Sequence, residues 1–273
     1  MSGTSRVLAV CADDFGLSPG VSLGIAALAR RERLNAISCL TNAPHWRAGA
    51  SLLRELPASV QVGLHFNLTE GVPASAELRR AWPRLPSLER LIVGAHLRLL
   101  PRAALAAELA AQWAAFVELT GQAPGFVDGH QHVHHLPLVR DIVLDSVAER
   151  SPRPALRNTG RVVGPGFGIK RALIAGTGGR ALQRALQRRG IAHNPVLTGV
   201  YDFVPGRYQA CMQRWLAGLP VGGGLLFCHP GAADTSSVAD PIAAARLAEA
   251  DYLGSEAFTQ DLQVAGVQLG RVW

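Results

Sequence analysis

Short apolar runs alternate with longer helical patterns along the whole chain, and this alternation restricts its fold more than any other feature. Strand-like runs lie near residues 7–12, 36–41, 60–66, 125–130, 155–158, 196–200, 223–228 and 267–269. Helical patterns lie between them, near residues 20–31, 45–55, 101–120, 137–149, 169–188, 207–218 and 241–254. Strands that alternate with helices usually pair in parallel, with the helices packed on the sheet. The sequence therefore predicts an α/β fold with mostly parallel strands.

Two stretches interrupt this alternation. Residues 71–101 contain Pro73, Pro83 and Pro86 and are too long for an ordinary connection, so we expect an irregular insertion that covers a binding site. Residues 160–195 are rich in glycine and arginine and form a second irregular insertion. A phosphate-binding loop there is disfavoured because the pattern GxxxxGK[ST] is absent. We interpret the second insertion as a cover or a dimer contact.

The composition fits one domain that spans residues 1–273. Of these residues, 48% are hydrophobic and 17% are charged, which is enough apolar material for a single core. The net charge of +7 comes almost entirely from arginine, since Lys170 is the only lysine. The densest basic stretch, residues 180–189, carries leucines at helical spacing, so we interpret it as one solvated helix face. We expect no nucleic-acid partner.

The remaining bulk features predict a cytoplasmic protein with no membrane partner. No apolar run approaches the roughly 18 residues of a membrane span. The few residues before the first predicted strand are too short for a signal peptide. The four cysteines, Cys11, Cys39, Cys211 and Cys228, form no CxxC pair, and we expect them to be reduced core residues.

The densest chemical signal is a group of histidines. Four of the nine histidines lie within residues 130–135, directly after a predicted strand. Neutral imidazole is the commonest metal ligand in proteins. Since alternate residues of a strand share a face, His130, His132 and His134 could point together. One local segment rarely supplies a whole coordination sphere, so we expect at most two of them to be ligands.

Two other strand ends offer ligands. Asp13 and Asp14 close the first predicted strand, and adjacent carboxylates repel each other unless a cation or a proton lies between them. The alternative is a solvated turn before a helix, with Ser18 as the N-cap. His65 ends the third predicted strand. One of the two acids, His65 and a histidine of the 130–135 group would leave coordination positions open, as catalytic metal sites do.

Four separated segments carry a resemblance to a known family. They are residues 12–21 (ADDFGLSPGV), 63–71 (GLHFNLTEG), 128–134 (DGHQHVH) and 228–231 (CHPG). In residue types and order they resemble the YdjC/ChbG-type carbohydrate deacetylases and, more distantly, the NodB-type polysaccharide deacetylases. The resemblance implies a distorted (β/α) barrel, a divalent metal ion and hydrolysis of the N-acetyl group of an amino sugar or short chito-oligosaccharide. It also implies a homodimer.

The resemblance assigns Asp14, His65 and His130 as metal ligands and leaves Asp13 as the catalytic base. A bound metal lowers the pKa of water towards about 7, and a nearby carboxylate can then take the proton. Mg²⁺ and Zn²⁺ both suit a mixed set of oxygen and nitrogen ligands. His229 follows another apolar run and is the expected proton donor to the leaving amine. The alternative for His229 is a histidine at a tight turn.

Other residues are expected around this centre. Asp128 precedes the first histidine of the group by two positions, which suits support of a ligand, a substrate contact or a turn cap. Arg157 could orient Asp13 or hold a sugar oxygen. Four more residues are expected in the cleft wall without an assigned role: Asn67, Glu70, His132 and His134.

Two other functions stay open from the sequence. An Fe(II) oxygenase with a two-His-one-carboxylate site would explain the ligand set but would give neither Asp13 nor His229 a task. A catalytically inactive glycan-binding barrel would keep the fold, although all the candidate catalytic residues are present in the chain.

Overall fold

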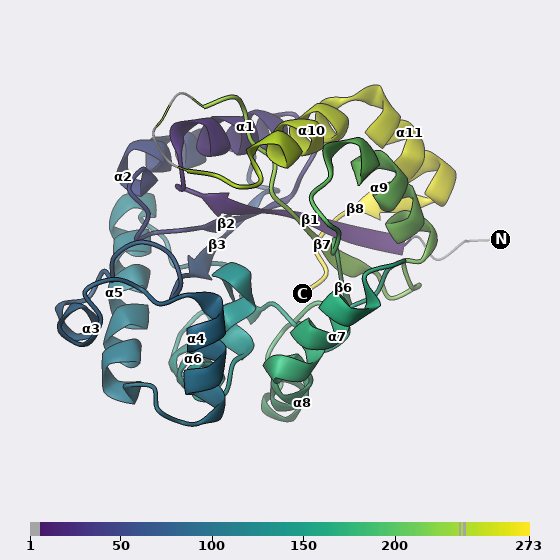
Figure 1. The fold of residues 1–273 in the computed structure, drawn as a ribbon. Helices are drawn as coiled ribbons and strands as arrows, with labels where there is room; N and C mark the ends of the chain where they lie inside the picture. Colours follow the sequence, from purple (N-terminus) through teal and green to yellow (C-terminus); the bar gives the residue numbers. More distant parts are fainter. Residues whose placement is uncertain (1–5, 235, 237–238) are drawn as a thin grey trace.

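The computed structural model describes residues 6–234, 236 and 239–273. At the centre of this part of the chain is an eight-stranded sheet whose hydrogen-bonded strand pairs are parallel. The strand order is β5-β4-β3-β2-β1-β7-β6, and β8 pairs with the start of β1 (Figure 1). The strands are β1 (Arg6–Phe15), β2 (Ala36–Cys39), β3 (Gln61–Phe66), β4 (Phe126–Gly129), β5 (Ala155–Leu156), β6 (Leu197–Thr198), β7 (Gly224–Cys228) and β8 (Val267–Leu269).

Helices pack around this sheet (Figure 1). The α-helices are α1 (Pro19–Arg30), α2 (Trp46–Gly49), α3 (Ala76–Ala81), α4 (Leu88–His96), α5 (Arg102–Thr120), α6 (Val139–Ala148), α7 (Gly168–Ile174), α8 (Arg180–Arg189), α9 (Tyr208–Ala217), α10 (Ala243–Gly254) and α11 (Glu256–Ala265). Three 3₁₀ segments and one π-helical segment complete the set: η1 (Ala50–Glu55), η2 (His130–His135), η3 (Ala175–Gly179, π) and η4 (Pro205–Arg207).

A pair of asparagines helps to close the barrel between the two edge strands, β5 and β6. The amide of Leu156 donates to the carbonyl of Ala192 (2.9 Å). Beyond it, the backbone amide of Asn158 donates to Oδ1 of Asn194 (2.7 Å), and Nδ2 of Asn194 donates to the carbonyl of Asn158 (3.0 Å). These side chains satisfy buried backbone groups where a regular ladder would otherwise do so. The curled parallel sheet is therefore a distorted barrel, as the resemblance implies.

Strand residues alternate between two cores. The larger core lies between the sheet and the helices. The smaller one faces the barrel interior and comprises Ala9, Cys11, Ala36, Phe126, Ala155, Leu197, Val200, Leu225 and Phe227. Asp13, Asp128 and His229 each follow one of these inner residues by two positions, and His65 lies between two residues of the outer core. Because alternate strand residues share a face, all four project into the barrel near the carboxyl ends of the strands.

The expected strands and helices are confirmed at all eight strand positions and at the seven helical patterns, with ends that differ by a few residues. The expectation of an irregular insertion at 71–101 is wrong, because it contains α3 and α4. Ser75 and Ser87 accept from the amides of Leu78 and Arg90 and cap these helices. The 160–195 stretch is largely helical as well, through α7, η3 and α8, and α11 was not anticipated.

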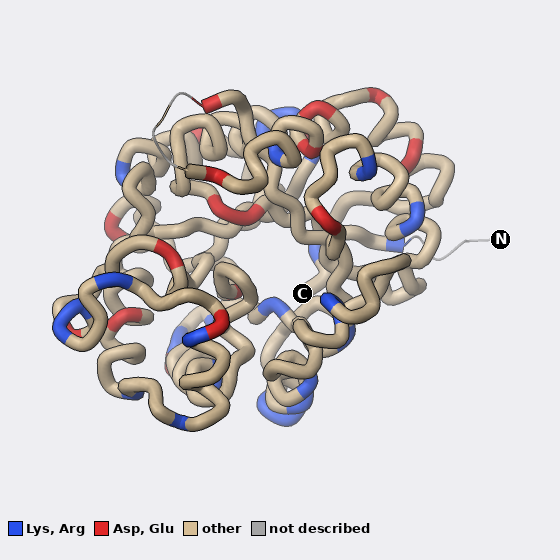
Figure 2. Tube along the Cα trace, viewed as in Figure 1, with Lys and Arg blue, Asp and Glu red and all other residues tan. Residues whose placement is uncertain are grey.

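Three expectations about bulk features can be compared with the structure. The arginines of α8 are exposed, and only Leu182, Ala185 and Leu186 of this helix are buried. Figure 2 shows these basic positions along the helix. The four cysteines are free thiols, and three of them are buried. In the described residues, every helix is too short or too polar to cross a bilayer.

The first prediction concerns Gly199, which directly follows β6. Its φ is +114°, and an added Cβ would collide with the backbone carbonyl oxygen of Phe227. We expect Gly199→Ala to lower the free energy of unfolding by about 2–4 kcal/mol, because backbone strain and steric overlap add. Gly206→Ala is the control, since nothing lies within 4 Å of a Cβ there. Urea denaturation measures both, and equal stability of the two variants would contradict this close approach of β6 and β7.

Candidate metal centre

A cavity of about 480 Å³ opens at the carboxyl ends of the strands. Seven of the residues singled out in the sequence line it: Asp13, Asp14, His65, Glu70, His130, His132 and His229. In parallel α/β folds this end of the sheet is where ligands bind. The cavity is therefore the candidate site.

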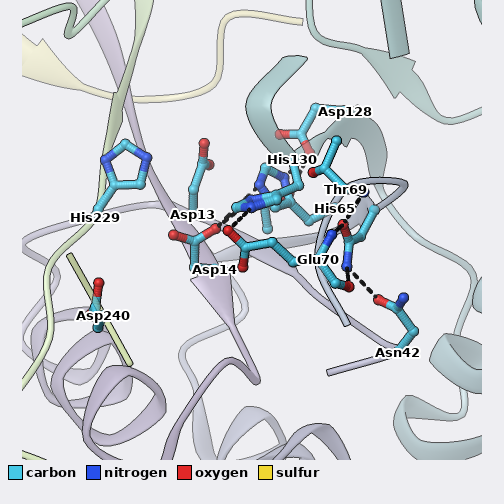
Figure 3. Close-up of polar contacts among 12 residues, drawn as sticks. Asp13, Asp14, Asn42, His65, Thr69, Glu70, Asp128, His130, His229 and Asp240 are labelled. Carbon is cyan, nitrogen blue, oxygen red and sulfur yellow. Dashed lines mark hydrogen bonds and ion pairs between the residues drawn. The ribbon is translucent and has the colours of Figure 1, made fainter. Parts of the chain in front are cut away.

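Three potential ligands come together on the cavity floor. Oδ1 of Asp14 lies 3.5 Å from Nε2 of His65 and 3.0 Å from Nδ1 of His130 (Figure 3). One ligand atom from each residue lies within 4.8 Å of the other two, and all three side chains are buried. They come from the ends of β1 and β3 and from the residue that follows β4.

A local irregularity of β1 explains how two adjacent residues enter the same cavity. Successive strand residues normally point to opposite faces. The pairing of β1 with β2 shifts register between Ala12 and Phe15, and Asp14 has a φ of 70°. Such a bulge re-aims one side chain and is common next to active sites. Asp14 therefore joins Asp13 on the inner side of the barrel.

The electrostatics of this cluster favour positive charge on its histidines. Burial disfavours a charged Asp14, but Arg246 and His130 hold its pKa well below the usual range. Burial also disfavours a charged His65, yet Asp128 and Asp13 raise the pKa of that imidazole to about 10. In the same way, burial opposes protonation of His130, whereas Asp14 raises its pKa to about 9. Nearby carboxylates thus stabilise cationic charge at both imidazoles.

These features fit a divalent cation. Nδ1 of His65 contacts Oδ1 of Asp128 at 2.6 Å and the hydroxyl of Ser38 at 3.0 Å, which turns Nε2 of the imidazole towards Asp14. A carboxylate that holds the far nitrogen of a histidine is the usual support of a metal ligand. A cation bound to Asp14, His65 and His130 would supply the positive charge that protons on the imidazoles otherwise provide. One oxygen and two nitrogen donors suit several divalent ions.

Arg157 holds the residues beside the cluster. Its guanidinium donates to both oxygens of Asp13, at 2.6 and 2.7 Å, and lies 2.5 Å from Oδ2 of Asp128. Arg157 and Asp128 are fully buried, at 0% exposure. Of the alternatives from the sequence, orientation of Asp13 agrees with this geometry, while a sugar contact of Arg157 is excluded by burial. Burial likewise excludes a substrate contact of Asp128, which supports His65 instead.

The idea that His130, His132 and His134 share a strand face is wrong. The strand ends at Gly129, and the next residues form the 3₁₀ segment η2, in which Gln131 and His132 have φ values of 52° and 63°. The His132 ring packs edge-on against Phe227 in the cavity wall. Nε2 of His134 instead contacts the carbonyl of Arg157 (2.9 Å), outside the cavity.

His229 faces the cluster from another wall. Figure 3 shows it on the other side of Asp13 and Asp14 from His65 and His130. Its ring packs edge-on against Phe203 and Phe227, and its backbone amide donates to Glu249 (2.5 Å). Burial among these groups lowers the pKa of His229 to about 4. The imidazole is therefore neutral at pH 7 in the free protein.

Asn67 shapes the loop after β3. Its Oδ1 accepts from the amides of Thr69 and Glu70, and its Nδ2 donates to the carbonyl of Glu70 and to Asn42. Asn67 is 2% exposed and lies outside the cavity lining, so the expected place in the cleft wall is wrong. The loop instead presents Glu70, whose Oε1 lies 3.1 Å from Nε2 of His130. The hydrogen bond to His130 lowers the pKa of the Glu70 carboxyl.

Two residues of α10 were missed. Nη2 of Arg246 donates to Oδ2 of Asp14 (2.8 Å), and its Nε donates to Asp240 (2.7 Å). Glu249 accepts hydrogen bonds from the hydroxyl of Tyr201 and from the backbone amide of His229. Burial raises the pKa of Glu249 to about 7. In the sequence, these two residues are an arginine and a glutamate three positions apart among apolar helix residues. In an arginine-rich chain this pattern does not indicate a functional site.

The second prediction concerns Arg157. Replacement by methionine leaves the carboxylates of Asp13 and Asp128 buried without their cation, so we expect Arg157→Met to lower the free energy of unfolding by about 3–5 kcal/mol. Arg207→Met is the control, because Arg207 pairs with Asp202 at the surface, with 64% of the arginine side chain exposed. Its effect should stay within about 1 kcal/mol. Similar losses for both variants in guanidinium denaturation would refute the stabilising role of Arg157.

Comparison with known proteins agrees with the four sequence segments. The family described as YdjC-like protein matches residues 7–264. Proteins named chitooligosaccharide deacetylase from Salmonella enteritidis PT4 and Salmonella newport are 38% identical over 152 residues, which cover 53% of this chain and 57% of theirs. The match thus spans about half the length of these curated relatives.

A solved structure shows the same fold. It comes from Enterococcus faecalis V583, from a protein whose proposed activity is cellobiose-phosphate cleavage. It has a TM-score of 0.73 and 19% identity and covers 98% of each chain. On the family match over most of its length, the chain belongs to the YdjC-like protein family.

Proposed function

We propose that this protein is a metal-dependent deacetylase that removes the N-acetyl group from an amino sugar or short chito-oligosaccharide. The observation that carries the proposal is the cluster of Asp14, His65 and His130 on a cavity floor, with Asp13 beside it. The relatives named chitooligosaccharide deacetylase support the substrate class. Mg²⁺ and Zn²⁺ are the proposed ions, since both accept mixed oxygen and nitrogen ligands.

In this proposal Asp14, His65 and His130 hold the ion. When bound, it supplies a Lewis acid for the acyl carbonyl and lowers the pKa of water. Asp13 takes a proton from the attacking water as general base. Arg157 fixes both oxygens of Asp13, so the base keeps one orientation.

The reaction is hydrolysis of an amide. The oxygen of water bonds to the acetyl carbon, the carbon–nitrogen bond breaks, and acetate and the free amine leave. The nitrogen needs a proton to depart, and His229 is the proposed donor. With a pKa of about 4 in the free protein, His229 is neutral at pH 7, so it takes up a proton from solvent before it protonates the nitrogen, and Asp13 returns the proton of the attacking water to solvent after the amine leaves. Negative charge that develops on the attacked carbonyl oxygen raises the pKa of a neighbouring imidazole and favours this gain.

Cytoplasmic location and a homodimer stay predictions from the sequence and the family resemblance. The substrate in that setting is a small glycan rather than an extracellular polymer.

The third prediction tests the reaction. Protein stripped of metal should release no acetate from chitobiose or longer chito-oligosaccharides, and addition of one ion among Mg²⁺, Zn²⁺, Mn²⁺ and Co²⁺ should restore release. Acetate is measured by a coupled assay, and circular dichroism verifies the fold. Absence of acetate with every ion in folded protein would refute the deacetylase. Oxygen consumption with Fe²⁺ would then favour an oxygenase. Tight glycan binding without any turnover would favour a glycan-binding barrel.

The fourth prediction separates ligand from base. Asp14→Ala and His65→Ala should lose bound metal and activity together, because each removes a donor atom. Asp13→Asn should keep the metal, measured by atomic absorption, and lower kcat by about 10²–10⁴-fold, the usual contribution of a general base. A near-normal kcat for Asp13→Asn would show that another group takes the proton.

A further inference from the structure

The wall of the cavity differs in chemistry from its floor. Away from the metal cluster, aliphatic side chains dominate the lining. Two helices each supply two of them: Leu88 and Ile92 come from α4, and Leu173 and Ile174 come from α7. Figure 1 shows α4 and α7 as separate helices in front of the sheet, and residues of both line the cavity.

Both helices leave apolar side chains uncovered. No residue of α7 is buried, and its Ile169 and Leu173 are 82% and 60% exposed. On and just after α4, Val93 and Leu97 are 57% and 62% exposed. Of these four residues, Leu173 lines the cavity, and a ligand that covers it there gains free energy, because burying apolar surface is favourable. The same cavity is lined by aliphatic residues of α4 and α7 and by the metal cluster, so a ligand that covers the aliphatic residues also reaches the reactive centre.

The same wall offers little to the hydroxyl groups of a second sugar. The ammonium of Lys170 donates to the carbonyl of Tyr201 (3.0 Å). The hydroxyl of Thr177 is shared between His135 (3.0 Å) and the carbonyl of Leu173 (2.8 Å). None of the five tryptophans lines the cavity. The aromatic rings that do line it, Tyr201, Phe203 and Phe227, pack against one another or against His132 and His229. A polar oligosaccharide would bury some of its hydroxyls against the aliphatic side chains of α4 and α7, where they lack partners, and this is unfavourable.

We propose that the substrate is an N-acyl amino sugar that carries an aliphatic group of several carbons, and that this group lies between α4 and α7. This inference rests on the proposed function and narrows its substrate class. The aliphatic group is attached either as the aglycone of the sugar or as the acyl chain on its nitrogen. In both cases the step at the metal cluster is the same: water cleaves the amide and yields a carboxylate and an amine.

The fifth prediction compares alkyl and polar substrates. The metal-loaded enzyme is given chitobiose, methyl and octyl β-N-acetylglucosaminide, and N-octanoylglucosamine, all below their micelle concentrations. We expect kcat/KM for at least one octyl compound to exceed that for chitobiose and for the methyl glycoside by at least tenfold. Preference for the octyl glycoside assigns the aliphatic group to the aglycone, and preference for N-octanoylglucosamine assigns it to the acyl chain.

A variant and its matched control locate the effect. Leu173→Asn places an amide in the cavity wall on a helix without buried residues, so the fold is retained. It should reduce the preference for the octyl substrate about tenfold. Ile169→Asn changes the same helix, but Ile169 does not line the cavity, and this variant should behave like the unchanged protein. Equal preference in both variants would place the alkyl group elsewhere and overturn the proposal.

Binding separates this inference from the proposed function. Calorimetric titration of the metal-loaded protein with octyl and methyl glycosides measures how tightly the aliphatic wall of the cavity binds the octyl group, whether or not turnover occurs. Tenfold tighter binding of the octyl compound without acetate or octanoate release would support the apolar site and refute the deacetylase. Acetate release with no preference for either octyl compound, in rate or in binding, would keep the deacetylase and overturn the apolar substrate.

Discussion

Two adjacent carboxylates, Asp13 and Asp14, lie at the end of the central strand where each is only 2% exposed. Buried charges of one sign must be compensated, or they shift their pKa or unfold the protein. Each acid has its own arginine: Arg157 for Asp13, and Arg246 for Asp14. The third buried acid, Asp128, shares Arg157 and binds His65. Asp240 also pairs with Arg246, so four carboxylates face two guanidinium groups and leave a net charge of −2, which His65, His130 and a cation can balance.

This compensation also holds distant parts of the chain together. Arg157 follows the edge strand β5, and Arg246 belongs to α10, so the two ion pairs tie β1 to one edge of the sheet and to an outer helix. Buried pairs contribute little net stability, but loss of one partner is costly. The positions of β5 and α10 and the orientation of the candidate base therefore depend on the same contacts. A site built in this way is preorganised, because its acids cannot turn away without exposing an unpaired charge to the interior.

The sequence predicts those parts of the structure that depend on local pattern. Apolar runs place the strands. Because parallel strands bring their carboxyl ends together, the runs predict a site that contains Asp13 or Asp14, His65, a histidine of the 130–135 group and His229, and the family resemblance selects Asp14 and His130. What the sequence misses depends on tertiary contact or on unusual backbone. The left-handed φ values at Gln131 and His132 end the strand alternation, and no pattern in the histidine run indicates them. In the sequence nothing distinguishes Arg246 from the other arginines, and only the fold brings it into contact with Asp14. The helices at 76–81 and 88–96 begin after serine N-caps, but the nearby prolines favoured the prediction of an irregular loop.

The charged floor and the aliphatic wall of the cavity influence each other. Interactions among Asp13, the ligand residues and His229 strengthen as water leaves, because charges act over a lower effective dielectric. Side chains such as Leu173 exclude water only when something fills the space between α4 and α7. A small polar sugar leaves that space wet, whereas an aliphatic group displaces the water and contributes binding free energy away from the reacting bond. Binding free energy gained at such a remote position can be used to orient the amide at the reactive centre. The wall is in this way coupled to the chemistry on the floor.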